Sequence, residues 1–121
     1  MKLHQAKTAG LNVFTGYGEG HVLINEARHD GNLLVTAEEI HPWEVSDFDA
    51  LQAAHFEQAL PYKPEVVLFG SGAKLRFPHP RLTAALTNAG IGVEVMDTQA
   101  ACRTYNILMA EDRKVLALLL T

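Results

Sequence analysis

Residues 93–120 read VEVMDTQAACRTYNILMAEDRKVLALLL, and this stretch decides the fold. An apolar run ends at Asp97-Thr98, a helical repeat follows, and a second apolar run begins near Lys114. Asp97 and Thr98 are both favourable helix N-cap residues, because their side-chain oxygens accept hydrogen bonds from the free amides of the first turn. The stretch therefore predicts a strand, a helix that begins at Thr98, and a second strand.

The apolar residues of this helix recur with the period of an amphipathic α-helix. They form one stripe, which consists of Thr98, Ala101, Cys102, Tyr105, Leu108 and Met109. Ala100, Thr104 and Ile107 fall on roughly the opposite face. Two interpretations of this second face stay open. It is a protein interface that involves Ala100 and Ile107, or it carries scattered apolar residues of the kind that are common on surfaces.

Upstream of this stretch, short apolar runs alternate with helical patterns. A serine followed by acidic residues predicts a helix over 46–60. Residues 65–69 predict a buried strand, which Gly70-Ser71-Gly72 ends. Residues 80–89 predict a further helix with a proline at its first position, and 92–96 the next strand. This alternation indicates an α/β fold whose sheet contains at least one parallel pair of strands.

The first third of the chain predicts an antiparallel meander. Strands are expected at 11–15, 21–25 and 33–36. Turns are expected between them, at 16–20 and 30–31. Residues 37–45 predict an irregular segment or a short strand, because Pro42 would stop a helix almost at once. Trp43 is expected to anchor the core rather than to stack on a ligand.

The second half of the chain also carries the motif of a known family. The matching residues are Gly70-Ser71-Gly72, Arg76, Pro78, Pro80, Gly90-Ile91, Glu94, 96–98, 101–106, Leu108, Glu111, Arg113 and Val115. On these residues the chain resembles the small Mth-domain proteins, which include the mitochondrial complex I assembly factor 3 group and the adipogenesis-associated Mth-domain proteins. The resemblance implies a single three-layer α/β domain over residues 1–121. A mixed central sheet is flanked by helices, with a small N-terminal antiparallel β element to one side. The family has no agreed activity, so the resemblance implies none for this chain.

Composition excludes several classes of protein. The net charge is −4 and the pI about 5.8, so no surplus of basic residues is available to neutralise phosphates. One cysteine cannot form an intramolecular disulfide, which is typical of a reducing compartment. Residues 1–11 lack the apolar run of a secretory signal, and no run is long enough to span a bilayer. We expect a soluble, cytoplasmic protein with no nucleic-acid partner and no membrane insertion.

The strongest candidate for a ligand site lies where two predicted strands end. Gly70-Ser71-Gly72 and Asp97-Thr98 follow strands joined by a helical crossover, so parallel strands would bring them to one edge of the sheet. Glycines permit close approach, a helix N-terminus offers amides to an anion, and an arginine could neutralise it. The candidate residues are Gly70, Ser71, Gly72, Arg76, Asp97, Thr98 and Arg103. A purely structural role, as a tight strand exit and helix caps, stays open.

Other reactive groups give weaker signals. Cys102 lies near a helix N-terminus beside Arg103, which favours a thiolate, but its place on the apolar stripe predicts burial. The six histidines show no metal-ligand spacing, and no nucleotide-binding motif is present, so we expect no metal and no cofactor. Glu94 should face away from its valine neighbours, and if that side is covered it needs an ion-pair partner such as Arg103 or Arg113. A structural ion pair is the first interpretation of Glu94, and a catalytic acid is the second.

Three hypotheses follow. The leading one is a binding or assembly-helper domain with no predicted catalytic residue, whose partner is another protein or a second copy of the chain. The resemblance connects this role to respiratory complex assembly. The alternative is a protein or enzyme that binds a small anionic ligand in the crevice at Gly70–Gly72 and Asp97–Arg103. The third is thiol redox sensing through Cys102.

Overall fold

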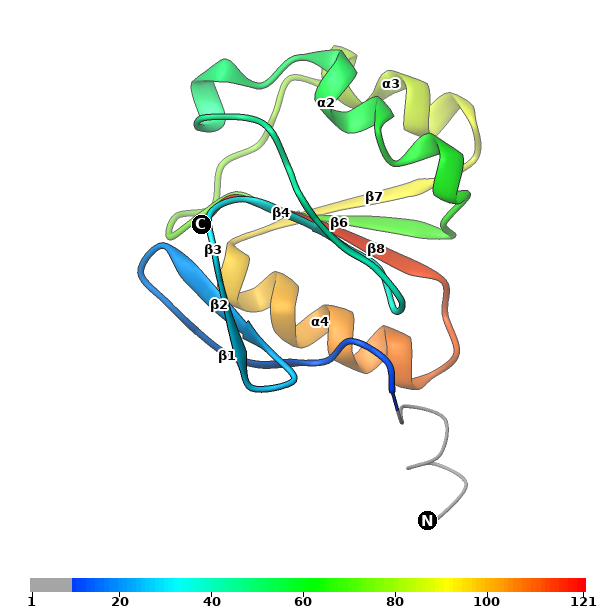
Figure 1. The fold of residues 1–121 in the computed structure, drawn as a ribbon. Helices are drawn as coiled ribbons and strands as arrows, with labels where there is room; N and C mark the ends of the chain where they lie inside the picture. The colour runs from blue at the N-terminus through cyan, green and yellow to red at the C-terminus, as the bar shows by residue number, and fades with distance from the viewer. Residues whose placement is uncertain (1–9) are drawn as a thin grey trace.

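The computed structural model describes residues 10–121 (Figure 1). In chain order the elements are β1 Phe14–Gly18, β2 His21–Ile24, β3 Ala27–Asp30, β4 Leu33–Val35, β5 Ile40–Pro42, the 3₁₀ helix η1 Phe48–Ala50, α2 Ala53–Glu57, the 3₁₀ helix η2 Leu60–Tyr62, β6 Val66–Gly70, α3 Pro80–Asn88, β7 Gly92–Met96, α4 Thr98–Ala110 and β8 Val115–Leu119. The prediction that residues 1–11 carry no secretory signal falls mostly on residues outside the described range. The assignment of 1–121 to one domain stays a prediction.

A five-stranded mixed sheet forms the centre of the fold, with the strand order β5-β4-β8-β6-β7. Strand β6 is parallel to β7 and to β8, whereas β4 is antiparallel to β8 and to β5. Strands β1, β2 and β3 form a separate antiparallel sheet. Helices α2 and α3 cover one face of the central sheet, and α4 and the small sheet lie on the other (Figure 1). The predicted three-layer α/β fold is confirmed.

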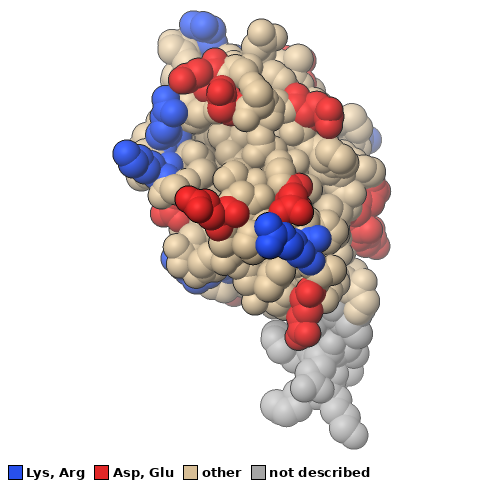
Figure 2. Space-filling view, turned by 60° about the vertical axis from the view of Figure 1, so that its left-hand side comes forward, with Lys and Arg blue, Asp and Glu red and all other residues tan. Residues whose placement is uncertain are grey.

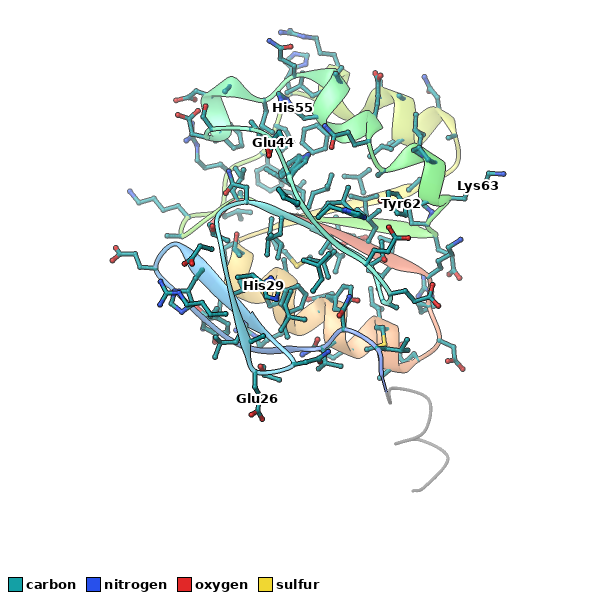
Figure 3. All side chains as sticks on the ribbon, in the orientation of Figure 1. Glu26, His29, Glu44, His55, Tyr62 and Lys63 are labelled. Carbon is teal, nitrogen blue, oxygen red and sulfur yellow. The ribbon has the colours of Figure 1, made fainter. Side chains whose placement is uncertain are left out.

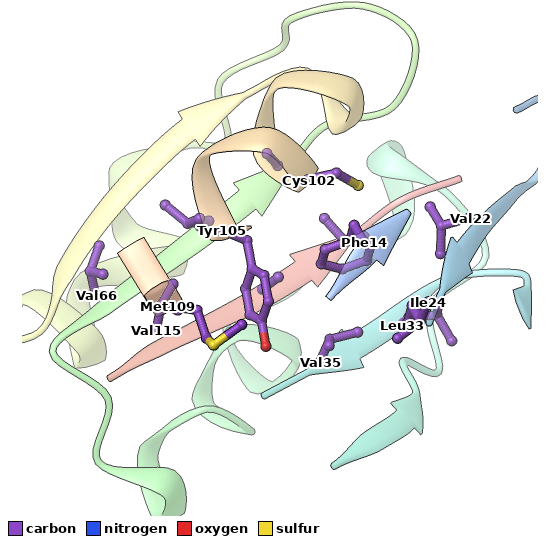
Figure 4. Packing of buried hydrophobic residues seen from close by; sticks show 14 residues of the cluster. Phe14, Val22, Ile24, Leu33, Val35, Val66, Cys102, Tyr105, Met109 and Val115 are labelled. Atoms are coloured by element: carbon purple, nitrogen blue, oxygen red, sulfur yellow. The ribbon is translucent and has the colours of Figure 1, made fainter. Parts of the chain in front are cut away.

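Helix α4 begins where the sequence predicts it. The Asp97 carboxylate accepts a hydrogen bond from the Ala100 amide at 2.9 Å and so caps the first turn. The buried residues of the helix are Thr98, Ala101, Cys102, Tyr105 and Met109. All of these except Thr98 belong to a hydrophobic cluster that also includes residues of β6, β8 and the small sheet (Figure 4). The predicted stripe is therefore the core face of α4, with Leu108 only partly buried at its margin.

Two side chains of α4 hold Phe14 of the small sheet. The ring of Tyr105 meets the ring of Phe14 edge-on, with the centroids 5.0 Å apart. The Asn106 side chain accepts a hydrogen bond from the Phe14 amide at 2.9 Å and donates one to its carbonyl at 2.7 Å. Because one carboxamide satisfies both backbone groups of Phe14, β1 is fixed in position and register against the helix.

The opposite face of the central sheet has its own core, centred on Trp43. The indole ring contacts the rings of Phe56 and Phe69, at centroid distances of 5.8 and 6.1 Å. Its Nε1 donates a hydrogen bond to the His55 carbonyl at 3.1 Å. The prediction that Trp43 anchors the core is confirmed, and the segment before it contains the short strand β5.

The prediction of one continuous helix over 46–60 is wrong. Three short elements, η1, α2 and η2, occupy this segment. Asp47, rather than Ser46, caps η1 by accepting a hydrogen bond from the Ala50 amide at 3.0 Å. Leu51 is extended (ψ 136°) and buried, so the chain leaves the helical conformation in order to place this side chain in the core. A capping box between Gln52 and His55 then starts α2.

The predicted turns of the first third are partly wrong. Strand β3 completes the meander, and a tight turn at Asn25-Glu26, with φ values of 50° and 69°, connects it to β2. Asp30-Gly31 instead leads the chain into β4, which belongs to the central sheet. Gly16 and Gly18 lie within β1, where side chains would collide with Leu23 and His21 of the neighbouring strand.

A single side chain joins the start of α4 to the ends of two strands. The Thr98 hydroxyl donates a hydrogen bond to the Leu120 carbonyl at 2.6 Å and accepts one from the Gly72 amide at 2.8 Å. The close approach requires a glycine at position 70. A Cβ there would lie 2.8 Å from Leu119 Cδ2 and 3.0 Å from Thr98 Cα. Gly70 is therefore a packing requirement at the edge where the candidate site lies.

We predict that Gly70→Ala destabilises the fold and that Gly92→Ala does not. A Cβ at Gly92 would meet nothing closer than 3.7 Å, which is ordinary van der Waals contact. Overpacking at Gly70 should reduce the free energy of unfolding by about 1–3 kcal/mol, whereas the change for the control should stay within about 0.5 kcal/mol. Urea unfolding measures both. Equal midpoints for the two variants would contradict the account.

The structure also bears on thiol chemistry. Cys102 is only 1% exposed, and burial raises the pKa of its thiol to about 12, against the opposing effect of the Arg103 charge. A buried, protonated thiol is a poor nucleophile, so the redox-sensing hypothesis loses its chemical basis.

We therefore expect Cys102 to resist Ellman's reagent in the native protein. One thiol per chain should react after unfolding in urea, because only then does solvent reach the sulfur. Native labelling at the rate of a free cysteine peptide would show that the core around α4 opens far more readily than this packing implies.

Candidate functional site

A pocket of about 340 Å³ opens at the edge of the central sheet where β6 and β7 end. Three parts of the chain line it: the β1–β2 hairpin through Tyr17, Gly18, Glu19 and His21, the exit from β6 through Gly72 and Ala73, and the start of α4 through Asp97, Thr98 and Gln99. Residues 120–121 complete the lining. The carboxyl ends of parallel strands therefore lie beside a cavity, as the sequence predicts.

Three of the seven predicted ligand residues line this pocket, namely Gly72, Asp97 and Thr98. Gly70 and Ser71 are buried behind it and have structural contacts. The Ser71 hydroxyl donates a hydrogen bond to the Lys74 carbonyl at 2.6 Å and accepts one from the Arg76 amide at 3.0 Å. Ser71 therefore shapes the loop after β6.

The amides at the start of α4 are largely used within the fold. The Thr98 amide donates to the Gly72 carbonyl at 2.9 Å, and the Ala101 amide to the Asp97 carbonyl at the same distance. The Ala100 amide donates to the Asp97 side chain. An anion would have to compete with these internal acceptors, so the helix N-terminus offers less than the sequence suggests.

The two predicted arginines do not line the pocket. The Arg76 guanidinium lies 3.1 Å from an Asp49 carboxylate oxygen and 4.0 Å from the centre of the Phe48 ring. Arg103 is exposed on α4. The charged residues that do line the pocket are the acids Glu19 and Asp97. The charge of the pocket is thus opposite to the one predicted, and it disfavours an anionic ligand.

The wall formed by the small sheet was not predicted. Tyr17 accepts a hydrogen bond from the Gln99 side-chain amide, which connects β1 to α4. The His21 ring lies over Gly18, and its Nδ1 is 3.2 Å from the Glu19 carbonyl. The glycines at every second position from Gly16 to Gly20 are the only trace of this packing in the sequence.

The loop after β6 exposes two large apolar side chains. Leu75 is 53% exposed and Phe77 is 70% exposed, on either side of the anchored Arg76. Tyr17, at 45% exposure, lies on the neighbouring hairpin. The loop and the hairpin tip run along the same edge of the molecule (Figure 1). We call the pocket together with Tyr17, Leu75 and Phe77 the strand-end face.

Figure 2 turns this edge of the molecule toward the reader. An uncharged central area is surrounded by acidic and basic side chains. Exposed apolar side chains such as Leu75 and Phe77 are typical of surfaces that bind other proteins.

The outer face of α4 is the second candidate surface. Ile107 is 59% exposed there, whereas Ala100 is half-buried. Glu94 is exposed on β7, so the condition under which it would need an ion-pair partner is not met. Arg113 pairs with Glu65 at 2.7 Å.

Other kinds of site find little support in the part of the chain that the structure describes. Between residues 10 and 121, no group of three or more His, Cys, Asp or Glu side chains is placed to hold a metal ion. His29 on the small sheet and His55 on α2, for example, lie on opposite sides of the central sheet (Figure 3). No helix in this range has the length and apolar character needed to cross a membrane.

Comparison with known proteins places the chain among relatives. A family model described as "Protein of unknown function (DUF498/DUF598)" matches residues 14–120. A Bordetella pertussis protein solved by NMR and described as a Mth938-like domain is 33% identical, with a TM-score of 0.81 over 93% of this chain and 87% of that one.

Two named relatives differ in what their names say. The 13 kDa major membrane protein of Francisella tularensis is 27% identical over 95% of each chain. The mouse NADH dehydrogenase (ubiquinone) 1 alpha subcomplex assembly factor 3 is 32% identical to this chain. The matched region covers 69% of this chain and 46% of the mouse protein. Both the family match and the fold agree with the resemblance found in the motif around α4, and the chain belongs to the DUF498/DUF598 family of proteins.

Proposed function

We propose that this chain is a non-catalytic protein-binding domain that helps to assemble a multi-subunit respiratory complex. The assembly role is supported by the relative named as an assembly factor of NADH dehydrogenase. Since one fold serves many functions, this likeness needs a physical surface to support it. A cytoplasmic location is part of the proposal.

The exposure of Leu75 and Phe77 is the observation that carries the proposal. These side chains would each gain roughly 1.5–3 kcal/mol on full burial, yet the fold leaves them in water. Their loop is not loosely held. The hydrogen bonds of Ser71 to the Lys74 carbonyl and from the Arg76 amide hold the backbone on both sides of Leu75. A backbone held in this way reduces the entropy that a partner must overcome on binding.

The outer face of α4 remains a second candidate for the interface, because Ile107 is exposed at its centre. A homodimer through Ala100 and Ile107 belongs to this second candidate. The anion-binding alternative receives less support, since the pocket is lined by Glu19 and Asp97 while Arg76 faces Asp49.

We expect the double substitution Leu75→Ser/Phe77→Ser to lower the amount of assembled NADH dehydrogenase in the source organism several-fold. The physical reason is the loss of the apolar contact that the partner would bury. Native gel electrophoresis with an NADH-activity stain measures the assembled complex. The purified variant should keep its urea midpoint, because exposed substitutions usually change stability by no more than about 0.5 kcal/mol.

Ile107→Ser is the matched control on the other face. A deficit with Ile107→Ser alone would move the interface to α4. Wild-type levels of the complex in both variants, at normal levels of the protein, would contradict the assembly role.

A further inference from the structure

We infer that the strand-end face recognises a segment of a partner protein in which one basic side chain, lysine or arginine, is flanked by apolar residues. This inference rests on the proposed protein-binding function and adds the chemistry of the partner. The basic side chain enters the pocket, and the apolar residues cover Leu75 and Phe77.

The charge of the pocket argues for the basic side chain. Glu19 from the hairpin and Asp97 from the start of α4 both line it, and no lysine or arginine in residues 10–121 does so. Asp97 uses one carboxylate oxygen to cap α4, and the second makes no hydrogen bond within the described fold. Lys74 is exposed on the adjacent loop but lies outside the lining. A cation bound here would therefore meet carboxylates from two elements, with no lysine or arginine of residues 10–121 in the lining to compete with it.

The size and composition of the pocket suit a side chain. Its volume of about 340 Å³ lies at the lower end of the roughly 300–1,000 Å³ typical of small-molecule sites. Tyr17 adds an aromatic ring to the wall, and a cation near the face of such a ring is attracted by its quadrupole. The aliphatic stem of a lysine or arginine would pack on apolar atoms while its head reaches the acids.

The exposed apolar residues set the spacing of the partner segment. Ala73 lines the pocket, and Leu75 and Phe77 follow two and four residues later in the same loop. An extended chain advances about 3.3 Å per residue, so the apolar anchors lie no more than about 7 and 14 Å from Ala73, and less where the loop bends at 72–74. A partner in extended conformation covers these distances with apolar side chains two and four residues from its basic residue.

The inference is tested with a synthetic peptide whose sequence reads the same in both directions. The peptide is acetyl-Phe-Gly-Leu-Gly-Arg-Gly-Leu-Gly-Phe-amide, and the matched peptide has glutamine in place of the central arginine. Titration into the isotope-labelled protein is followed by the NMR shifts of backbone amides. We expect millimolar affinity for the arginine peptide, about tenfold weaker affinity for the glutamine peptide, and shifts concentrated in 17–21, 72–77 and 97–99.

Charge-removing variants separate the two halves of the interaction. Glu19→Gln and Asp97→Asn should lower affinity for the arginine peptide to that of the glutamine peptide and leave the latter unchanged. Asparagine also caps helices well, so the second variant keeps the start of α4. Glu38→Gln removes an exposed acid that does not line this pocket, and it should behave as wild type. Phe77→Ser should weaken both peptides.

Equal affinity of the two peptides, or full affinity for the arginine peptide in Glu19→Gln, would overturn the basic anchor. If Phe77→Ser still weakened binding in that case, the proposed protein-binding function would stand without it. Absence of shifts at 17–21 and 72–77 with either peptide at 10 mM would overturn the inference as a whole.

Discussion

The contact between Thr98 and the ends of β6 and β8 is the constraint on which the site depends. The Thr98 hydroxyl donates a hydrogen bond to the Leu120 carbonyl and accepts one from the Gly72 amide. The whole Thr98 residue is only 8% exposed. Buried hydrogen bonds of this kind cost more to break than they contribute when formed, because the groups left behind have no water. The missing side chain at Gly70 lets the helix come this close. The loop after β6 and the start of α4 are consequently held as one wall of the pocket.

The opposite wall depends on α4 as well. Asn106 and Tyr105 hold Phe14 at the beginning of β1, and Gln99 binds Tyr17 further along that strand. One helix therefore helps to position both walls of the pocket. Substitutions along α4 should affect the pocket even where they do not line it, since the two walls share this support.

The sequence predicts those parts of the fold that local signals decide. Asp97 as a cap, the apolar stripe of α4 and the apolar runs around it are such signals, and all of them are found in the structure. The prediction of one helix over 46–60 is wrong because the position of Leu51 is decided by packing in the core rather than by helix propensity. The turn at Asn25-Glu26 is not predicted because glutamate rarely adopts a positive φ.

The site is harder to predict than the fold for a related reason. The sequence places Gly72 and Asp97 at one edge through the parallel-strand rule, and the structure agrees. It gives no means of knowing that Arg76 turns toward Asp49, or that Glu19 arrives from the small sheet. Those two facts reverse the charge of the pocket, and with it the chemistry of the ligand that fits.

The central claim is that this domain binds another protein through its strand-end face. Hydrogen–deuterium exchange of the tagged chain, compared alone and in the complex isolated from its source organism, tests it most directly. The account predicts slower amide exchange in 17–21 and 72–77 within the complex, because a bound partner excludes solvent there. Slowing confined to α4 at 98–110, or no slowing in any part of the chain, would contradict it.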